Sequence, residues 1–164
     1  MAGYAYFSPS NITTVEGLNS LEVWIERICN QKNISNSYFG TILVATSDLY
    51  NLLLALDPQW SPAVYCSSQR GAFLIGFEAP NNFLDVAALV QKDLGDIVRQ
   101  PEMNFYEACI VNVRTCADAV QLDEQRHAIE LIFYLKSINP YQTQLRRKLV
   151  DGYIEGVCAP KIIN

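Results

Sequence analysis

The sequence predicts an α+β fold, a two-layer α/β sandwich in which helices cover one face of a mixed, mostly antiparallel sheet. The expected elements run strand, helix, helix, strand, strand, helix, an ambiguous segment and a strand pair, with short connections. The 164 residues are the size of one domain, and 50% of them are apolar, which is enough for a substantial core. We expect residues 1–138 to form the domain and residues 139–164 to form its C-terminal helical extension and tail.

The first two elements are predicted by their periodicity. Residues 4–9 alternate aromatic and small side chains, which is typical of a strand with one covered face. Apolar residues then recur at three- and four-residue spacing between Leu18 and Ile28, which predicts a helix over residues 14–31. Thr13 and Glu16 have the spacing of a capping box at its start.

A second helix is predicted over residues 38–56, which are apolar on nearly every face and end at Asp57 and Pro58. Such a helix belongs in the centre of a fold. Its longest apolar run, residues 42–56, contains polar side chains and is shorter than the roughly 20 residues that a membrane span needs. The N-terminal residues lack the basic and apolar regions of a signal peptide, so we expect a cytoplasmic protein without a membrane anchor.

Two strands are predicted over residues 63–68 and 71–78, joined by a turn at Gly71. Residues 83–98 predict a third, shorter helix, with Leu84 among the apolar positions that indicate it. The segment 105–118 fits either a helix or a strand, because its centre is rich in β-branched residues.

Residues 119–136 predict a hairpin, since apolar and polar residues alternate on both sides of a four-residue turn. His127, the only histidine, lies at this turn, and the five cysteines lack CxxC spacing, so we do not expect a zinc site or a Ser/His/Asp triad. We expect the cysteines to be reduced and mostly buried. Seventeen acidic against twelve basic residues, with no basic block, argue against a nucleic-acid partner.

The hairpin string "ADAVQLDEQRHAIELIFYL", the string "VATSD" and the element order together resemble the histidine-kinase-like ATPase (GHKL) superfamily, and in particular its small anti-sigma-factor serine kinases. The resemblance covers residues 4–136. It implies the ATPase fold, a site for Mg-ATP or ADP, and a sigma factor or an antagonist-type domain as partner.

Carried over to this chain, the family's first box places its acid at Asp48. The family's magnesium-binding asparagine then falls at Leu52, whereas the amide present is Asn51, displaced by about 100° around the helix. The alternative register keeps Asn51 but puts Ser47 in the position of the acid. In either register, the chain therefore lacks either the acid or the asparagine of the family's first box.

The second box, "EAPNNF", places Glu78 where the family has its adenine-reading aspartate and Phe83 where it has its own phenylalanine. Pro80 and Asn82 replace glycines, which removes the flexibility that lets a backbone approach a nucleotide. We keep Glu78, Asn81, Asn82 and Phe83 as candidate ligand-binding residues. The asparagines also have a purely structural explanation as turn formers.

The third box falls on residues 107–109, "EAC", where the family has a phosphate-cradling "GxG". Glu107 would place a negative charge near a polyphosphate. No glycine lies between Gly95 and Gly152, so a glycine-rich phosphate lid is missing from the sequence.

These departures predict a non-catalytic regulatory protein, a pseudokinase that binds another protein or a second copy of itself and needs no cofactor. One alternative is a diverged but active serine/threonine kinase, in which Asp48 is the general base and Asn51 the ligand of the magnesium in Mg-ATP. Another is an unrelated α/β domain in which Asp48 and Asn51 serve only as solvated or loop-capping polar groups.

Overall fold

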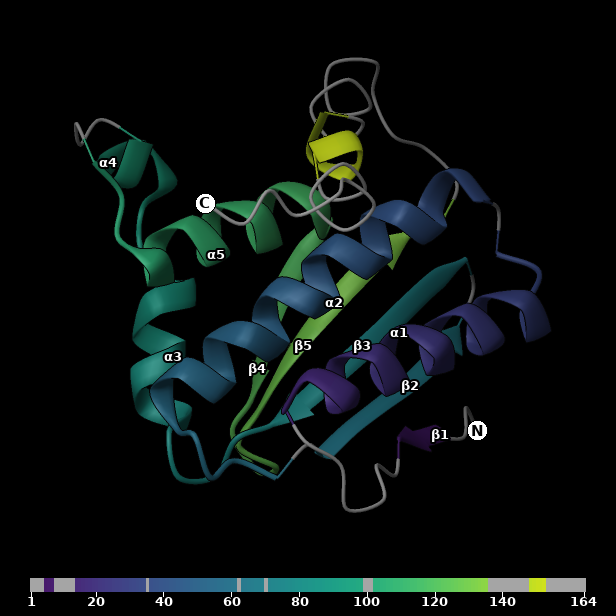
Figure 1. Cartoon of the computed structure of the whole chain (residues 1–164), viewed down its shortest axis with the longest axis horizontal. Coiled ribbons are helices and arrows are strands. Elements are labelled where there is room, and N and C mark those ends of the chain that lie inside the picture. The colour runs from purple at the N-terminus through teal and green to yellow at the C-terminus, as the bar shows by residue number, and fades with distance from the viewer. Residues whose placement is uncertain are drawn as a thin grey trace, which may run out of the picture.

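The computed structural model describes residues 5–7, 14–34, 36–61, 63–69, 71–98, 102–135 and 148–152. Figure 1 shows its strands and helices in chain order. They are β1 (Ala5–Phe7), α1 (Thr14–Gln31), α2 (Asn36–Leu56), β2 (Ala63–Gln69), β3 (Ala72–Glu78), α3 (Phe83–Val90), α4 (Leu94–Val98), α5 (Phe105–Cys116), β4 (Ala119–Asp123) and β5 (Ala128–Tyr134). Residues 148–152 form one more short helix.

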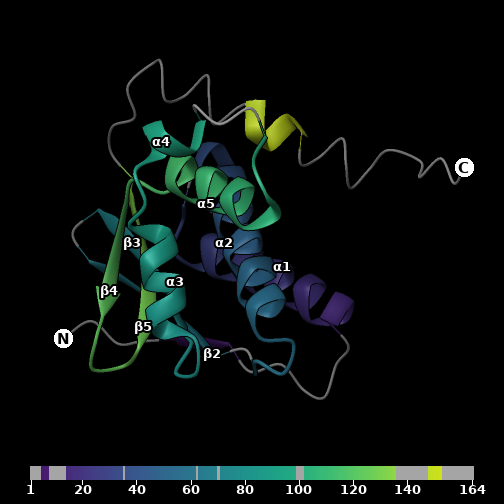
Figure 2. The ribbon, with the colours of Figure 1, turned by 90° about the vertical axis from the view of Figure 1, so that its left-hand side faces the viewer.

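The sheet has the strand order β1-β2-β3-β5-β4, and every pair of neighbouring strands in it is antiparallel. Figure 2 shows α1, α2, α3 and α5 on one side of this sheet. The predicted α+β fold with a helix layer on one face is therefore confirmed. The hairpin is also confirmed, with residues 124–127 as its four-residue turn.

The core lies between the sheet and α2. Successive strand residues point to opposite faces, so the apolar residues that alternate along β3 and β5 all face the helices. Three directly opposed pairs on this face are Phe73–Phe133, Ile75–Leu131 and Phe77–Ile129. Their side chains are at most 1% exposed, and Leu49 and Leu53 of α2 are fully buried in the same cluster.

Helix α2 contains the one stretch of the described residues, Tyr38–Leu56, that is long and apolar enough to cross a membrane, with a mean hydropathy of 1.5. In the fold it lies between α1 and α5 and above the sheet (Figure 1). Its apolar surface is therefore covered by protein, as expected for the central helix of a core. Gly40 lets the short helix at 148–152 pack against it, because a Cβ there would lie 2.7 Å from Cγ1 of Val150.

The structure resolves the two possibilities left open for residues 105–118 in favour of a helix. Asn104 caps α5 by accepting a hydrogen bond from the N–H of Glu107 at 2.8 Å, while the Glu107 carboxylate accepts one from the N–H of Asn104 at 3.2 Å. This capping box supplies partners for backbone groups that the helix itself leaves unpaired. The β-branched residues at its centre pack against α2 instead of joining the sheet.

The single helix predicted over residues 83–98 is wrong in detail, because the chain turns at residues 91–93 and forms two short helices. Asp93 starts the second by accepting a hydrogen bond from the N–H of Gly95 at 2.7 Å. The buried face of α3 consists of Phe83, Val86 and Val90. Leu84 is 81% exposed, although it was among the apolar residues that indicated the helix.

The face of the sheet opposite the helices carries one row of contacting side chains, with one position from each strand. The row runs through Tyr6, Tyr65, Gly76, Glu130 and Gln121, which are paired in register across all five strands. The Tyr65 hydroxyl donates to Oε2 of Glu130 at 2.6 Å, and the Gln121 amide donates to Oε1 at 2.7 Å. Gly76 is required beneath the Tyr65 ring, since any Cβ there would overlap the ring.

Candidate functional site

The centre of α2 places the three residues predicted from the first box in different surroundings. Ser47 is fully buried, and its hydroxyl has no hydrogen-bond partner among the described residues. Asp48 is half-buried and faces α5, where its Oδ2 accepts a hydrogen bond from Nδ2 of Asn112 at 2.7 Å. Asn51 is half-buried one turn further along. Asp48 is thus a contact between two helices.

Burial governs the electrostatics of this contact. It raises the pKa of Asp48 above its ordinary value, and the hydrogen bond from Asn112 opposes the rise without cancelling it. Burial, together with the nearby charge of Asp48, raises the pKa of the Cys109 thiol to about 12. Cys109 and Asn112 lie three residues apart on α5, so both face α2 at this point. Cys109 is buried and forms no disulfide, as expected from the sequence, and the same holds for Cys29, Cys66 and Cys116.

The residues predicted from the second box separate into two groups. Glu78 ends β3, and its backbone carbonyl accepts a hydrogen bond from the indole N–H of Trp60 at 2.8 Å. Asn81, Asn82 and Phe83 instead line a cavity of about 600 Å³, which we call the α3 hollow. Its other lining residues are Pro80, Leu84, Asp85, Glu124 and His127.

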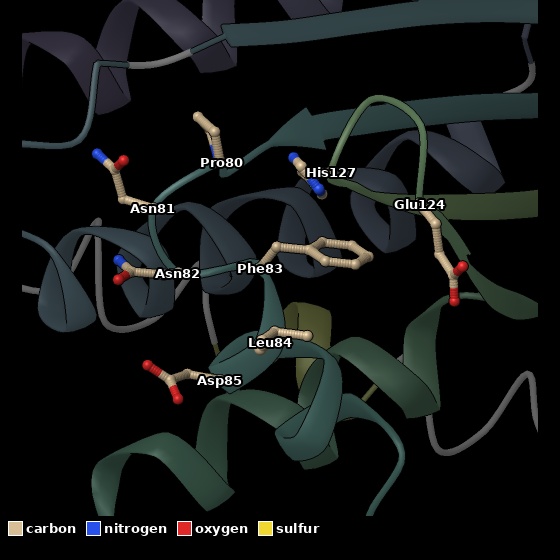
Figure 3. Close-up of a pocket in the computed structure, with 8 residues that line it drawn as sticks. All are labelled: Pro80, Asn81, Asn82, Phe83, Leu84, Asp85, Glu124 and His127. Carbon is tan, nitrogen blue, oxygen red and sulfur yellow. The ribbon is translucent and has the colours of Figure 1, made fainter.

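Figure 3 shows how these side chains lie in the α3 hollow. The Phe83 ring and Leu84 point toward the β4–β5 turn, which carries Glu124 and His127. The Phe83 and His127 ring centroids are 5.3 Å apart. Asp85 projects from the opposite side of the Phe83–Leu84 pair (Figure 3). The hollow therefore combines an apolar centre with a carboxylate on each side.

Five of these lining residues were not predicted as site residues, namely Pro80, Leu84, Asp85, Glu124 and His127. The hairpin itself was predicted, but only the antiparallel pairing of β5 with β3 places its turn beside the segment that follows β3. The N–H of Ala79 donates to the carbonyl of His127 at 2.9 Å and joins the two segments. The exposure of Leu84 had no signal, since it depends on how α3 is rotated against the core.

A second cavity of about 220 Å³, the α4 hollow, contains the residue predicted from the third box. It is lined by Lys92, Asp93, Asp96, Ile97 and Glu107. Glu107 is only 6% exposed, and its carboxylate takes part in the capping box that starts α5. The two hollows share no lining residue, and neither is lined by Asp48 or Asn51. The predicted boxes are thus distributed over three places in the fold.

Within the described residues, no group of three or more His, Cys, Asp or Glu side chains is arranged to hold a metal ion. Comparisons of the chain with protein-family models, with curated proteins and with solved structures find no match. Function is therefore inferred from the contacts that these side chains make.

Proposed function

We propose that this protein is a non-catalytic regulatory protein that acts by binding another protein or a second copy of itself, on a scaffold of the histidine-kinase-like ATPase type. It would act in the cytoplasm of a bacterium. The sequence resemblance suggests a sigma factor or an antagonist-type domain as the partner. The helix layer on one face of a sheet is the two-layer architecture that the resemblance implies, while the sheet, expected to be mixed, is antiparallel between all neighbouring strands.

The hydrogen bond between Asn112 and Asp48 is the observation that carries this proposal. An acid that activates an attacking group must present its oxygens to that group within hydrogen-bond reach. Oδ2 of Asp48 is instead engaged at 2.7 Å by the neighbouring helix. Its carboxylate therefore serves to join α2 and α5.

The other two boxes support the same conclusion. Glu107 caps the start of α5, at the position where the resemblance implies a phosphate cradle. A carboxylate at such a position repels phosphate. Asn81, Asn82 and Phe83 line a hollow to which neither Asp48 nor Glu107 contributes. A nucleotide bound there would be out of contact with both acids.

The alternative function, an active serine/threonine kinase, is favoured by one observation. Burial raises the pKa of Asp48, and a raised pKa suits a general base. In that function Asn112 would have to release Asp48 when Mg-ATP binds, and Asn51 would hold the metal.

Thermal unfolding with Mg-ATP or Mg-ADP separates the two functions. A nucleotide at 100 times its dissociation constant adds about 2.7 kcal/mol to the free energy of unfolding, which is about 5–11 °C for a chain of this size. We expect no rise at millimolar nucleotide and no transfer of γ-phosphate to protein. A rise that the variant Asp48→Asn abolishes, together with transfer of γ-phosphate to protein, would establish the kinase and overturn our proposal.

The binding half of the proposal has its own test. We expect either a dimer by sedimentation or a stoichiometric complex with a purified sigma factor or antagonist domain from the source organism. A monomer that forms no complex with any of these proteins would refute it. An unrelated α/β domain would give neither nucleotide binding nor these complexes.

A further inference from the structure

We propose that the α3 hollow is the docking site for a protein partner, and that it takes a segment in which a basic side chain stands next to a large apolar one. This inference rests on the proposed function and makes it specific, because it assigns binding to one place and one chemistry. The hollow has a volume of about 600 Å³ and lies between the start of α3 and the β4–β5 turn (Figure 3).

Its apolar centre is exposed. Leu84 is 81% exposed, the highest value among the large apolar side chains that are exposed in the described residues. The neighbouring Phe83 ring is 7% exposed and lies at a tilt of 48° to the His127 ring. A partner's apolar side chain would cover Leu84 and remove both surfaces from water, which is the main source of affinity at protein interfaces.

The charges around this centre have one sign. Asp85 and Glu124 are both exposed and stand on opposite sides of Leu84 (Figure 3). None of the eight described lining residues is a lysine or an arginine. Arg126, in the same turn, lies over the Tyr65 ring with its Cζ 5.0 Å from the ring centroid. A cationic side chain is attracted to such acidic side chains, and Asp85 in the first turn of α3 offsets the partial positive charge of the helix start that also faces this place.

The walls of the hollow are held in place before any partner arrives. The β3–α3 connection and the β4–β5 turn are joined by the hydrogen bond from the Ala79 N–H to the His127 carbonyl. Oδ1 of Asp123 accepts hydrogen bonds from the N–H groups of Gln125 and Arg126 at 3.0 and 3.1 Å, which fixes the turn. A preformed site loses less conformational entropy on binding than a flexible one.

Charge also separates the possible occupants. A second copy of this chain has a net charge of −5 overall, but its residues 145–149, "LRRKL", set basic side chains beside leucine, so binding by a second copy would appear as a concentration-dependent dimer in sedimentation. A nucleotide or a free phosphate brings only negative charge. A partner segment with Lys or Arg beside Leu, Ile or Phe complements both the apolar centre and the two carboxylates.

Two end-capped hexapeptides provide the test, Ala-Arg-Leu-Leu-Arg-Ala and its counterpart with glutamate in place of both arginines. Backbone amide shifts of the full-length, isotope-labelled protein are followed during titration to millimolar peptide. We expect the basic peptide to shift residues 81–85 and 124–128, and the acidic peptide to leave them unchanged. Equal binding of both peptides, shifts confined to other surfaces, or no shift at all would overturn the proposal.

Variants then locate the contacts. Leu84→Ala should weaken binding of the basic peptide about tenfold, since it removes most of one exposed leucine contact. Asp85→Asn and Glu124→Gln should each weaken it about two- to fivefold, the range of exposed ion pairs. The matched controls Val23→Ala on α1 and Glu102→Gln, both exposed and outside the hollow, should leave it unchanged. Equal effects of controls and test variants would refute the assignment.

The outcomes also distinguish this inference from the proposed function. If a purified sigma factor or antagonist domain binds but is insensitive to Leu84→Ala and Glu124→Gln, the α3 hollow is the wrong place and the protein-binding function stands. If Mg-ATP binds next to Asp48 and its γ-phosphate is transferred to protein while the basic peptide still shifts residues 81–85, the non-catalytic function fails and the docking site stands.

Discussion

The bond between Asn112 and Asp48 can be tested by the variant Asn112→Ala. The variant leaves a half-buried carboxylate without the donor that lies 2.7 Å from it. A hydrogen bond to a charged group contributes about 1.5–3 kcal/mol to the free energy of unfolding. For a chain of this length that corresponds to a fall of about 3–12 °C in the melting temperature at pH 7.

The raised pKa of Asp48 also predicts how the stability cost of Asn112→Ala changes with pH. The pKa of Asp48 in the folded state is raised above its ordinary value of 3.8. Between that ordinary value and the raised pKa, the folded state therefore binds the proton more tightly than the unfolded state does. The contribution of Asp48 to stability is therefore most favourable at low pH and decreases as the pH rises through this window. Asn112→Ala removes the bond that favours the charged form, so its cost should be larger at pH 7 than at pH 4.

Urea unfolding followed by circular dichroism at both pH values measures this difference. Asp48→Asn is the matched variant, because its amide oxygen still accepts from Asn112 while the buried charge is gone. We expect it to be at least as stable as the wild type at pH 7. An Asn112→Ala loss below about 0.5 kcal/mol, which is the range of neutral surface changes, would refute the structural role of Asp48. So would a loss that is independent of pH.

Two other variants and one labelling experiment have predictable outcomes. Gly76→Ala should cost about 2–5 kcal/mol in urea unfolding, because the new methyl group overlaps Tyr65 and weakens its hydrogen bond to the buried Glu130 carboxylate; a loss below about 1 kcal/mol would contradict this. Asn104→Ala should lower the melting temperature by about 1–8 °C through loss of the α5 cap, and an unchanged melting temperature would argue against that cap. Cys109, with a pKa of about 12, should resist iodoacetamide at pH 8 in the native protein and react in guanidinium, as read by mass spectrometry; rapid native labelling would show that α2 and α5 separate.

The elements that could be predicted from the sequence are those whose periodic pattern of apolar residues corresponds to the face that is buried in the fold. Apolar and polar residues alternate along the β4–β5 hairpin because one face of each strand is covered. Helix α1 has one apolar stripe because only one of its faces packs against the core. For α5 the pattern was ambiguous, since a buried helix and a buried strand are both rich in apolar residues. The capping box at Asn104 and Glu107 was the missed local signal for a helix.

The candidate site could be predicted only in part. Asp48 is recognisable in the sequence as an acid on an apolar helix, but its hydrogen-bond partner Asn112 lies 64 residues further along the chain. Asn81, Asn82 and Phe83 line one hollow, and the other wall of this hollow comes from the β4–β5 turn. The spacing of residues within one segment does not indicate which distant segment will pack against it.

The sequence alone therefore determined the type and order of most elements and the central place of α2. These properties depend on local periodicity and on the chemistry of single residues. Only the tertiary structure decided that Asp48 is engaged by α5, that Leu84 faces water and that Gly76 lies beneath Tyr65. Each of these depends on how two separate segments rotate against each other when the core closes, because packing selects one rotation from several that the local pattern allows.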